Sequence, residues 1–156
     1  MKLQIEWQRP VPLKRVRSGV GIYEVDLDKF PREPGIYIFA RKWSTSYEAL
    51  YVGKSKRIRG RIRGHMNNLK LMQHIHEAKT GKRVVLYGKP ITKPGQKMDK
   101  ILSTLEKALI KHFLLQGHDI VNSQGTSVRR HVITSTGRLP RAFIPSNMFI
   151  ERRRGE

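Results

Sequence analysis

The sequence predicts a single α/β domain whose elements follow in the order strand, strand, helix, strand, helix. Its 156 residues are the length of one ordinary domain. Short apolar, aromatic-rich runs bounded by Gly and Pro alternate with two longer stretches of helical periodicity. We find no internal repeat, low-complexity tract, secretory signal pattern or apolar run of about 18 residues. We therefore expect a soluble cytoplasmic protein with no membrane partner.

The first two strands are expected at residues 36–40 and 50–52, joined by the polar hairpin loop 41–48. Before them, residues 1–32 mix apolar side chains with basic residues and three prolines. Proline removes a backbone donor and favours turns, so we expect an N-terminal extension with one short strand. The core of the domain would then begin at residue 33.

The next elements follow from a change to helical spacing. Apolar residues recur every three or four positions over residues 55–79, where Ser55 offers an N-cap oxygen and Gly81 follows the end. A third strand is expected at 83–87, then a loop with two prolines, then a second amphipathic helix at 97–116. The domain core would span 33–124. Residues 125–156 form a basic C-terminal extension, of which some apolar residues are expected to pack: Phe143, Ile144, Met148 and Phe149.

The charge of the chain indicates a polyanionic partner. Lys and Arg number 32 against 12 Asp and Glu, a formal net charge of +20, and nucleic acid is the commonest polyanion. Charge alone does not separate a nuclease from a basic RNA-binding protein of the ribosomal type. The absence of cysteine excludes disulfides, thiolate zinc sites and cysteine nucleophiles. The carboxylates are scattered and the six histidines lack a compact ligand spacing, which disfavours two-metal and histidine-metal nuclease sites.

Glu106 lies inside the apolar stripe of the second helix, between Leu102 and Leu109. A carboxylate there must be paired, protonated or bound to a cation, because an unpaired buried charge costs several kcal/mol. An ion pair with an arginine and a Mg²⁺ site both remain open, since Mg²⁺ needs few protein ligands.

Arg61 and His65 are one helical turn apart, so both can reach a common phosphate. The planar guanidinium of Arg61 suits charge developing on phosphate oxygens, although basic residues surround it. His65 continues the apolar stripe and could instead be a histidine at the edge of the core. Tyr37 and Tyr51 fall on neighbouring strands, where a tyrosine usually packs but can also orient a water molecule.

Pro34-Gly35-Ile36-Tyr37, followed by Tyr51-Val52-Gly53 and by Arg61 on a helix, resembles the GIY-YIG nuclease superfamily. The resemblance extends from about residue 34 to 124. It implies a small, mostly antiparallel three-stranded sheet flanked by helices. An earlier Gly21-Ile22-Tyr23 repeats the letters but lies 28 residues before Tyr51, against 14 for Tyr37.

The resemblance also implies an activity, that of a Mg²⁺-dependent endonuclease that hydrolyses phosphodiester bonds in double-stranded DNA, with Mn²⁺ as a substitute metal. Glu106 would hold the metal, Arg61 would stabilise the pentacovalent state, and Asn122 would support the site. Tyr37, helped by Tyr51 or His65, would activate water, and which of the three takes the proton stays open. The implied DNA-contacting residues are basic: Lys54, Lys56, Arg57, Arg59, Arg63, Arg129 and Arg130.

Within that family the absence of cysteine and the short chain favour a stand-alone restriction, mobile-element or defence nuclease, with a homo-oligomer for double-strand cleavage. The alternative is a non-catalytic nucleic-acid-binding protein on the same fold.

Gly53 is expected to let the second strand turn sharply into Lys54. Lys54 is in turn expected to lie near a phosphate or a tyrosine.

Overall fold

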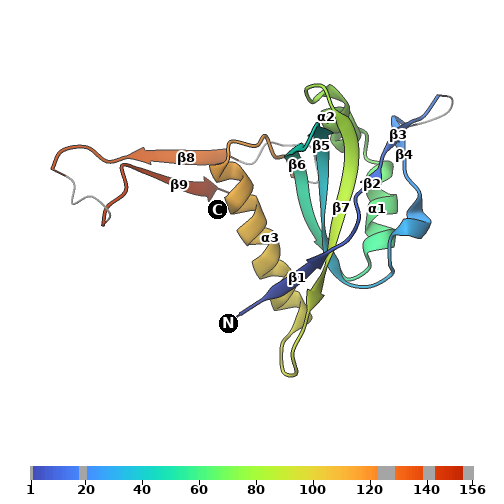
Figure 1. Cartoon of the computed structure of the whole chain (residues 1–156), viewed down its shortest axis with the longest axis horizontal. Coiled ribbons are helices and arrows are strands. Elements are labelled where there is room, and N and C mark those ends of the chain that lie inside the picture. The colour runs from blue at the N-terminus through green and yellow to red at the C-terminus, as the bar shows by residue number, and fades with distance from the viewer. Residues whose placement is uncertain (1, 18–20, 123–128, 139–142, 153–156) are drawn as a thin grey trace.

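An antiparallel sheet of five strands forms the centre of the computed structural model (Figure 1). The structure describes residues 2–17, 21–122, 129–138 and 143–152. The strand order is β1-β7-β5-β6, and β2 also pairs with β7. The prediction of an α/β fold with a mostly antiparallel sheet is confirmed, but the prediction of three strands was wrong. The strand bounds are β1 Gln4–Trp7, β2 Val11–Pro12, β5 Gly35–Trp43, β6 Ser46–Ser55 and β7 Lys82–Ile91.

Helices cover both faces of this sheet, because its central strand is apolar on both sides. Tyr37 and Phe39 of β5 point to one face, where α1 (Ile58–Met66) and α2 (Leu69–Glu77) pack. Ile36 and Ile38 point to the other face, where α3 (Met98–Leu115) packs. The expected covering of the sheet by helices is therefore confirmed.

The first 32 residues contribute more regular structure than the sequence indicates. β1 and β2 pair along the free edge of β7, from Gln4 opposite Ile91 to Pro12 opposite Val84. β3 (Lys14–Arg15) and β4 (Tyr23–Glu24) make a separate two-stranded sheet, and the short 3₁₀ helix η1 (Leu27–Lys29) follows. The prediction of one short strand was wrong, since four short strands form here. The reason is that backbone pairing with β7 needs no long apolar run. That pairing also extends β7 beyond the expected 83–87.

The expected long helix 55–79 is two helices, separated at Asn67 and Asn68. The side chain of Asn68 accepts a hydrogen bond from the Leu71 backbone N–H at 3.1 Å, which is the N-cap of α2. Ser55 does not cap α1. Its hydroxyl bonds the backbone of Arg57, and β6 continues through Ser55. The second helix was expected at 97–116 and spans Met98–Leu115.

The C-terminal segment forms a hairpin of β8 (Arg129–Thr134) and β9 (Asn147–Arg152), which projects from the α/β body beside the end of α3 (Figure 1). The expected packing of its apolar residues was wrong for three of them, since Phe143 is 81 % exposed and Ile144 and Met148 are exposed as well. The side chain of Phe149 lies outside the described residues. None of the helices in the described ranges is both long and apolar enough to cross a lipid bilayer.

Candidate active site

Three predicted site residues meet in the core between the sheet and α1. The Tyr37 hydroxyl on β5 lies 2.6 Å from His65 Nε2 on α1. The Tyr51 ring on β6 lies 6.0 Å from the Tyr37 ring and 5.0 Å from the His65 ring, measured between centroids. All three side chains are buried, and Tyr37 has no exposed surface. The structure thus brings together two tyrosines and a histidine that are spread over 29 residues of sequence.

Gly53 makes room for the Tyr37 ring. It lies directly opposite Tyr37 in the β5–β6 pair. A Cβ added at Gly53 would contact the Tyr37 hydroxyl and would lie 2.5 Å from the ring carbon Cζ. The expected sharp turn at Gly53 was wrong, since β6 continues two residues further, and the position requires glycine for space.

These surroundings keep the cluster neutral. Burial, and next the neighbouring Tyr51, raise the pKa of Tyr37 far above its ordinary value. Burial likewise raises the pKa of Tyr51. Burial, together with the positive charge of Arg61, lowers the pKa of His65 to about 4. At neutral pH both tyrosines therefore carry their protons and His65 is uncharged.

Arg61 reaches the same hydroxyl groups from the solvent side. Its side chain is exposed, and hydrogen bonding to Tyr37 is the largest influence on its pKa, which is raised. Its charge in turn acts on the pKa values of Tyr37, Tyr51 and His65. Arg61 and His65 both lie on α1, one helical turn apart, and both act on the Tyr37 hydroxyl.

Glu106 comes to this cluster from α3, on the other face of the sheet. Its carboxylate Oε2 lies 3.2 Å from Lys54 Nζ, and its side chain is 15 % exposed. Lys54 Nζ also donates a hydrogen bond to Ser103 Oγ at 2.9 Å, one helical turn before Glu106. The charge of Glu106 raises the pKa of Tyr51, which places it within electrostatic reach of the tyrosines. The expected ion-pair alternative is present, with a lysine rather than an arginine as the partner.

Asn122 is carried to the edge of β6 by the segment after α3. The Val121 N–H donates a hydrogen bond to the Leu50 carbonyl at 3.1 Å, and Val121 forms a parallel bridge with Tyr51. Asn122 is the next residue, so its backbone lies beside the cluster. Ser103 is the polar neighbour that the sequence reasoning missed, and its position three residues before Glu106 is the pattern that points to it.

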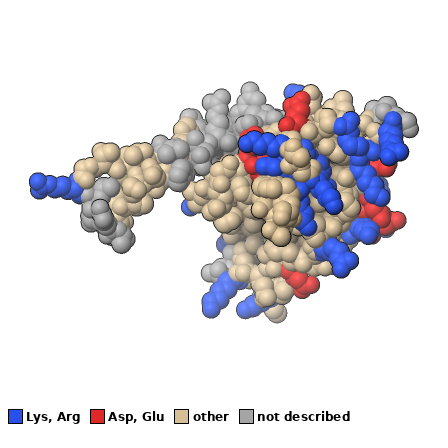
Figure 2. Space-filling model, turned by 45° about the horizontal axis from the view of Figure 1, so that its top comes forward, with Lys and Arg blue, Asp and Glu red and all other residues tan. Residues whose placement is uncertain are grey.

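The predicted DNA-contacting residues have different surroundings. Arg57 and Arg63 are exposed, and Lys56 pairs with Asp99 at 3.0 Å on the surface. Arg59 donates a hydrogen bond from Nε to the Phe30 carbonyl at 2.8 Å, so it connects α1 to the end of η1. The side chains of Arg129 and Arg130, on β8, lie outside the described residues. Figure 2 shows Lys and Arg gathered on the α/β body.

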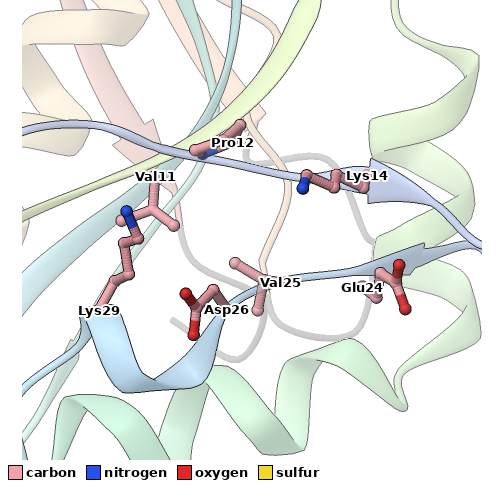
Figure 3. Close-up of a pocket in the computed structure, with 7 residues that line it drawn as sticks. All are labelled: Val11, Pro12, Lys14, Glu24, Val25, Asp26 and Lys29. Carbon is pink, nitrogen blue, oxygen red and sulfur yellow. The ribbon is translucent and has the colours of Figure 1, made fainter.

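Tyr23, the repeated Gly-Ile-Tyr tyrosine, lies elsewhere. It is buried on β4, and its hydroxyl is 3.4 Å from His76 Nδ1 on α2. Nearby, a pocket of about 450 Å³ opens between the β2–β3 segment and the chain from β4 to η1 (Figure 3). Two lysines and two carboxylates line it with apolar side chains, and none of the predicted site residues does.

The donors at Glu106 fit a hard cation. Within the described residues no group of three or more His, Asp or Glu side chains gathers, so a metal would take one protein carboxylate here and complete its shell with water or phosphate oxygens, as Mg²⁺ commonly does. The nearby tyrosine hydroxyls and the carboxylate are all oxygen groups. Lys54 would have to share the carboxylate with the metal.

Comparisons of the chain with family models, with curated proteins and with solved structures found no match. The assignment of a function therefore depends on the geometry of the site.

Proposed function

We propose that this protein is a metal-dependent endonuclease of the GIY-YIG type, which hydrolyses phosphodiester bonds in DNA. One observation carries the proposal: the Tyr37 hydroxyl is 2.6 Å from the buried, neutral His65, and the exposed Arg61 acts on the pKa of Tyr37 from the solvent side. A buried tyrosine hydroxyl needs one hydrogen-bond partner for packing alone, and His65 supplies it. The charge of Arg61 beside the same hydroxyl is the part that packing does not explain. The role as a restriction, mobile-element or defence enzyme belongs to the same proposal.

The neutral cluster favours a proton relay over a preformed tyrosinate. Because burial raises the pKa of Tyr37, its ionised form is scarce at neutral pH. In the tautomer with the proton on Nδ1, His65 Nε2 accepts from the Tyr37 hydroxyl. Tyr37 has no exposed surface, so the attacking water would take the place of Arg61 beside Tyr37 Oη when Arg61 moves to the phosphate. As this water oxygen attacks phosphorus, one water proton would pass to Tyr37 Oη while the Tyr37 proton passes to His65, and the bond to the leaving oxygen breaks. A bound phosphate would favour this step, since its negative charge raises the pKa of His65.

Arg61 and Glu106 would act on the charge of the phosphate. Arg61 has an exposed side chain beside the tyrosines, so its guanidinium can meet the non-bridging oxygens as charge develops on them. Glu106 would hold Mg²⁺, with Asn122 at the neighbouring edge of β6. When bound, the metal would polarise the phosphate and stabilise the leaving oxygen.

The second candidate function is a non-catalytic nucleic-acid-binding protein. The ion pair between Lys54 and Glu106 favours it, because this pair satisfies the carboxylate without a metal. The two functions make opposite predictions for a cleavage assay.

The deciding experiment incubates the purified full chain with supercoiled plasmid DNA in Mg²⁺, in Mn²⁺ and in EDTA. We expect nicked or linear product with either metal and none in EDTA. Glu106→Ala should abolish cleavage while DNA binding is kept. Asp99→Ala is the matched control, because it removes an acidic partner of a lysine from the same helix at an exposed position. Cleavage by Glu106→Ala at the wild-type rate would refute the metal role, and wild-type protein with no cleavage under any of these conditions would favour the binding protein.

A further inference from the structure

The hairpin turn between β5 and β6 presents two aromatic rings to solvent. The turn residues are Ser44 and Thr45, and Ser44 has a left-handed φ of 52°. Trp43 just before them is 40 % exposed, and Tyr47 just after them is 38 % exposed. Neither ring belongs to a core cluster of the structure, so part of each ring is available to a ligand.

The two rings lie on opposite faces of the hairpin. Trp43 continues the alternation of Tyr37, Phe39 and Arg41 along one face of β5. Tyr47 is paired directly with Lys42, and these two point to the other face. The hairpin tip therefore offers an aromatic surface on each side.

A basic side chain lies over each of the two aromatic rings. The Arg41 guanidinium carbon lies 3.9 Å from the centroid of the Trp43 ring, and Lys42 Nζ lies 5.4 Å from that of Tyr47. Arg41 is itself fixed, because it donates one hydrogen bond to Glu48 and one to the Thr80 carbonyl, both at 2.9 Å. Trp43 is thus supported by a guanidinium that cannot move freely.

Flat rings backed by cations on a chain of net charge +20 suit unpaired nucleic-acid bases. Each base presents a π face that stacks on Trp or Tyr, and a nearby lysine can meet the adjoining phosphate. Lys82 supplies a further exposed cation opposite Lys42 in the β5–β7 pair. A protein partner would gain little from two rings separated by the thickness of a hairpin and surrounded by basic residues.

We propose that the tip of the β5–β6 hairpin, Trp43 to Tyr47, binds unpaired bases of the nucleic-acid substrate by stacking. Trp43 and Tyr37 lie on the same face of β5, six residues apart, which is about 20 Å along an extended strand. The substrate class is then DNA with unpaired bases several nucleotides from the phosphate to be cleaved. The cleavage of that DNA depends on the proposed function, whereas the stacking does not.

The test measures binding in EDTA, where no metal-dependent cleavage occurs. Trp7 and Trp43 are the two tryptophans of the chain, so a Trp7→Phe variant reports on Trp43 alone. Oligo(dT) of about 12 nucleotides should quench this fluorescence. Trp43→Ala in the otherwise wild-type chain should weaken the binding of labelled oligo(dT) by about tenfold or more and that of a blunt duplex by less than about threefold. Tyr47→Ala should likewise weaken the binding of oligo(dT) more than the binding of the blunt duplex.

Trp7→Ala is the matched control, because Trp7 is 38 % exposed on β1, at the opposite side of the sheet. Trp43→Phe should bind oligo(dT) with most of the wild-type affinity, since it keeps a ring on which a base can stack. This variant therefore distinguishes a loss of stacking from a folding defect. Equal weakening by Trp7→Ala and Trp43→Ala, or fluorescence of Trp43 that oligo(dT) leaves unchanged, would overturn the proposal. Normal stacking with no plasmid cleavage would refute the proposed function alone.

Discussion

At the residue scale, the Tyr37 hydroxyl lies among groups that act on its proton in opposite directions. Burial and Tyr51 raise its pKa, whereas hydrogen bonding to Arg61 lowers it. His65 is close enough to exchange a proton with it. The side chain is thus placed for proton transfer although it is not ionised at rest.

Removing this hydroxyl should stop the chemistry and leave the fold intact. We expect Tyr37→Phe to lower the cleavage rate by a factor of about 10² to 10⁴, the usual contribution of a positioned acid or base, because the relay loses its central group. Plasmid cleavage at saturating DNA measures this. Tyr23→Phe is the control, since Tyr23 is also a buried tyrosine near a histidine. If Tyr23→Phe were the inactive variant, the site would be misplaced.

The stability of the protein should fall in acid because of His65. Its pKa is about 4 in the fold and about 6.5 in the unfolded chain, so between these pH values the unfolded chain binds the extra proton. The free energy of unfolding is therefore at its full value above pH 6.5 and decreases by up to about 3 kcal/mol as the pH falls toward 4.

Urea unfolding of wild type and His65→Gln at pH 7.5 and pH 4.5 measures this contribution. The variant should lose less stability than the wild type between pH 7.5 and pH 4.5. The loss that remains includes a contribution from His118, whose pKa is also lowered by burial. Equal losses in the two proteins would contradict a neutral, buried His65.

The members of the site could be predicted from sequence because short motifs fixed their spacing. Tyr37 and Tyr51 follow from two tripeptides, and the helical spacing of Arg61 and His65 places them on one face. The partner of Glu106 could not be predicted, because Lys54 reaches it across the edge of β6, a contact that depends on how α3 crosses the sheet. Many basic residues were equally available as partners in the sequence.

At the element scale, the β5–β6 pair depends on a missing side chain. Because a Cβ at Gly53 would overlap the Tyr37 ring, Gly53→Ala should displace that ring and cost about 1 to 3 kcal/mol of stability, with a large loss of cleavage. Gly64→Ala is the control. A Cβ there meets nothing within 4 Å, so this change within α1 should stabilise the protein by about 0.5 to 1 kcal/mol. Thermal unfolding and plasmid cleavage test both variants, and an active, stable Gly53→Ala would contradict the described packing.

Helices and strands whose apolar residues recur with a strong periodicity could be predicted from the sequence. Those with a weak apolar pattern could not. α3 matches its expected bounds within one residue at each end because its apolar stripe is continuous. The first expected helix is two helices because the cap made by Asn68 competes with helix continuation inside a periodic stretch. β1 and β2 are short and exposed on one side, so their sequence carries no pattern that separates them from a loop.

At the scale of the whole molecule, the first 16 residues close one side of the sheet. Removing residues 2–16 should leave the edge of β7 unpaired and remove Val11 and Leu13 from the core. We expect the truncated protein to aggregate, because an exposed long strand edge pairs with other chains. Light scattering after size-exclusion chromatography measures this. Removing only residues 2–8 keeps β2, Val11 and Leu13, and should be tolerated much better. Two equally monomeric truncations would show that β2 does not protect the edge.

Because of the same pairing, the sheet can be completed only late in the synthesis of the chain. Val11 pairs with Val85 and Gln4 with Ile91, so the first strands are synthesised more than seventy residues before their partner. At about 5 to 20 residues per second, that interval is roughly 4 to 16 seconds. During that interval, β1 and β2 have no strand with which to pair. The sheet can therefore be completed only after β7 has been made, and the backbone groups of β1 and β2 stay without their sheet partner until then.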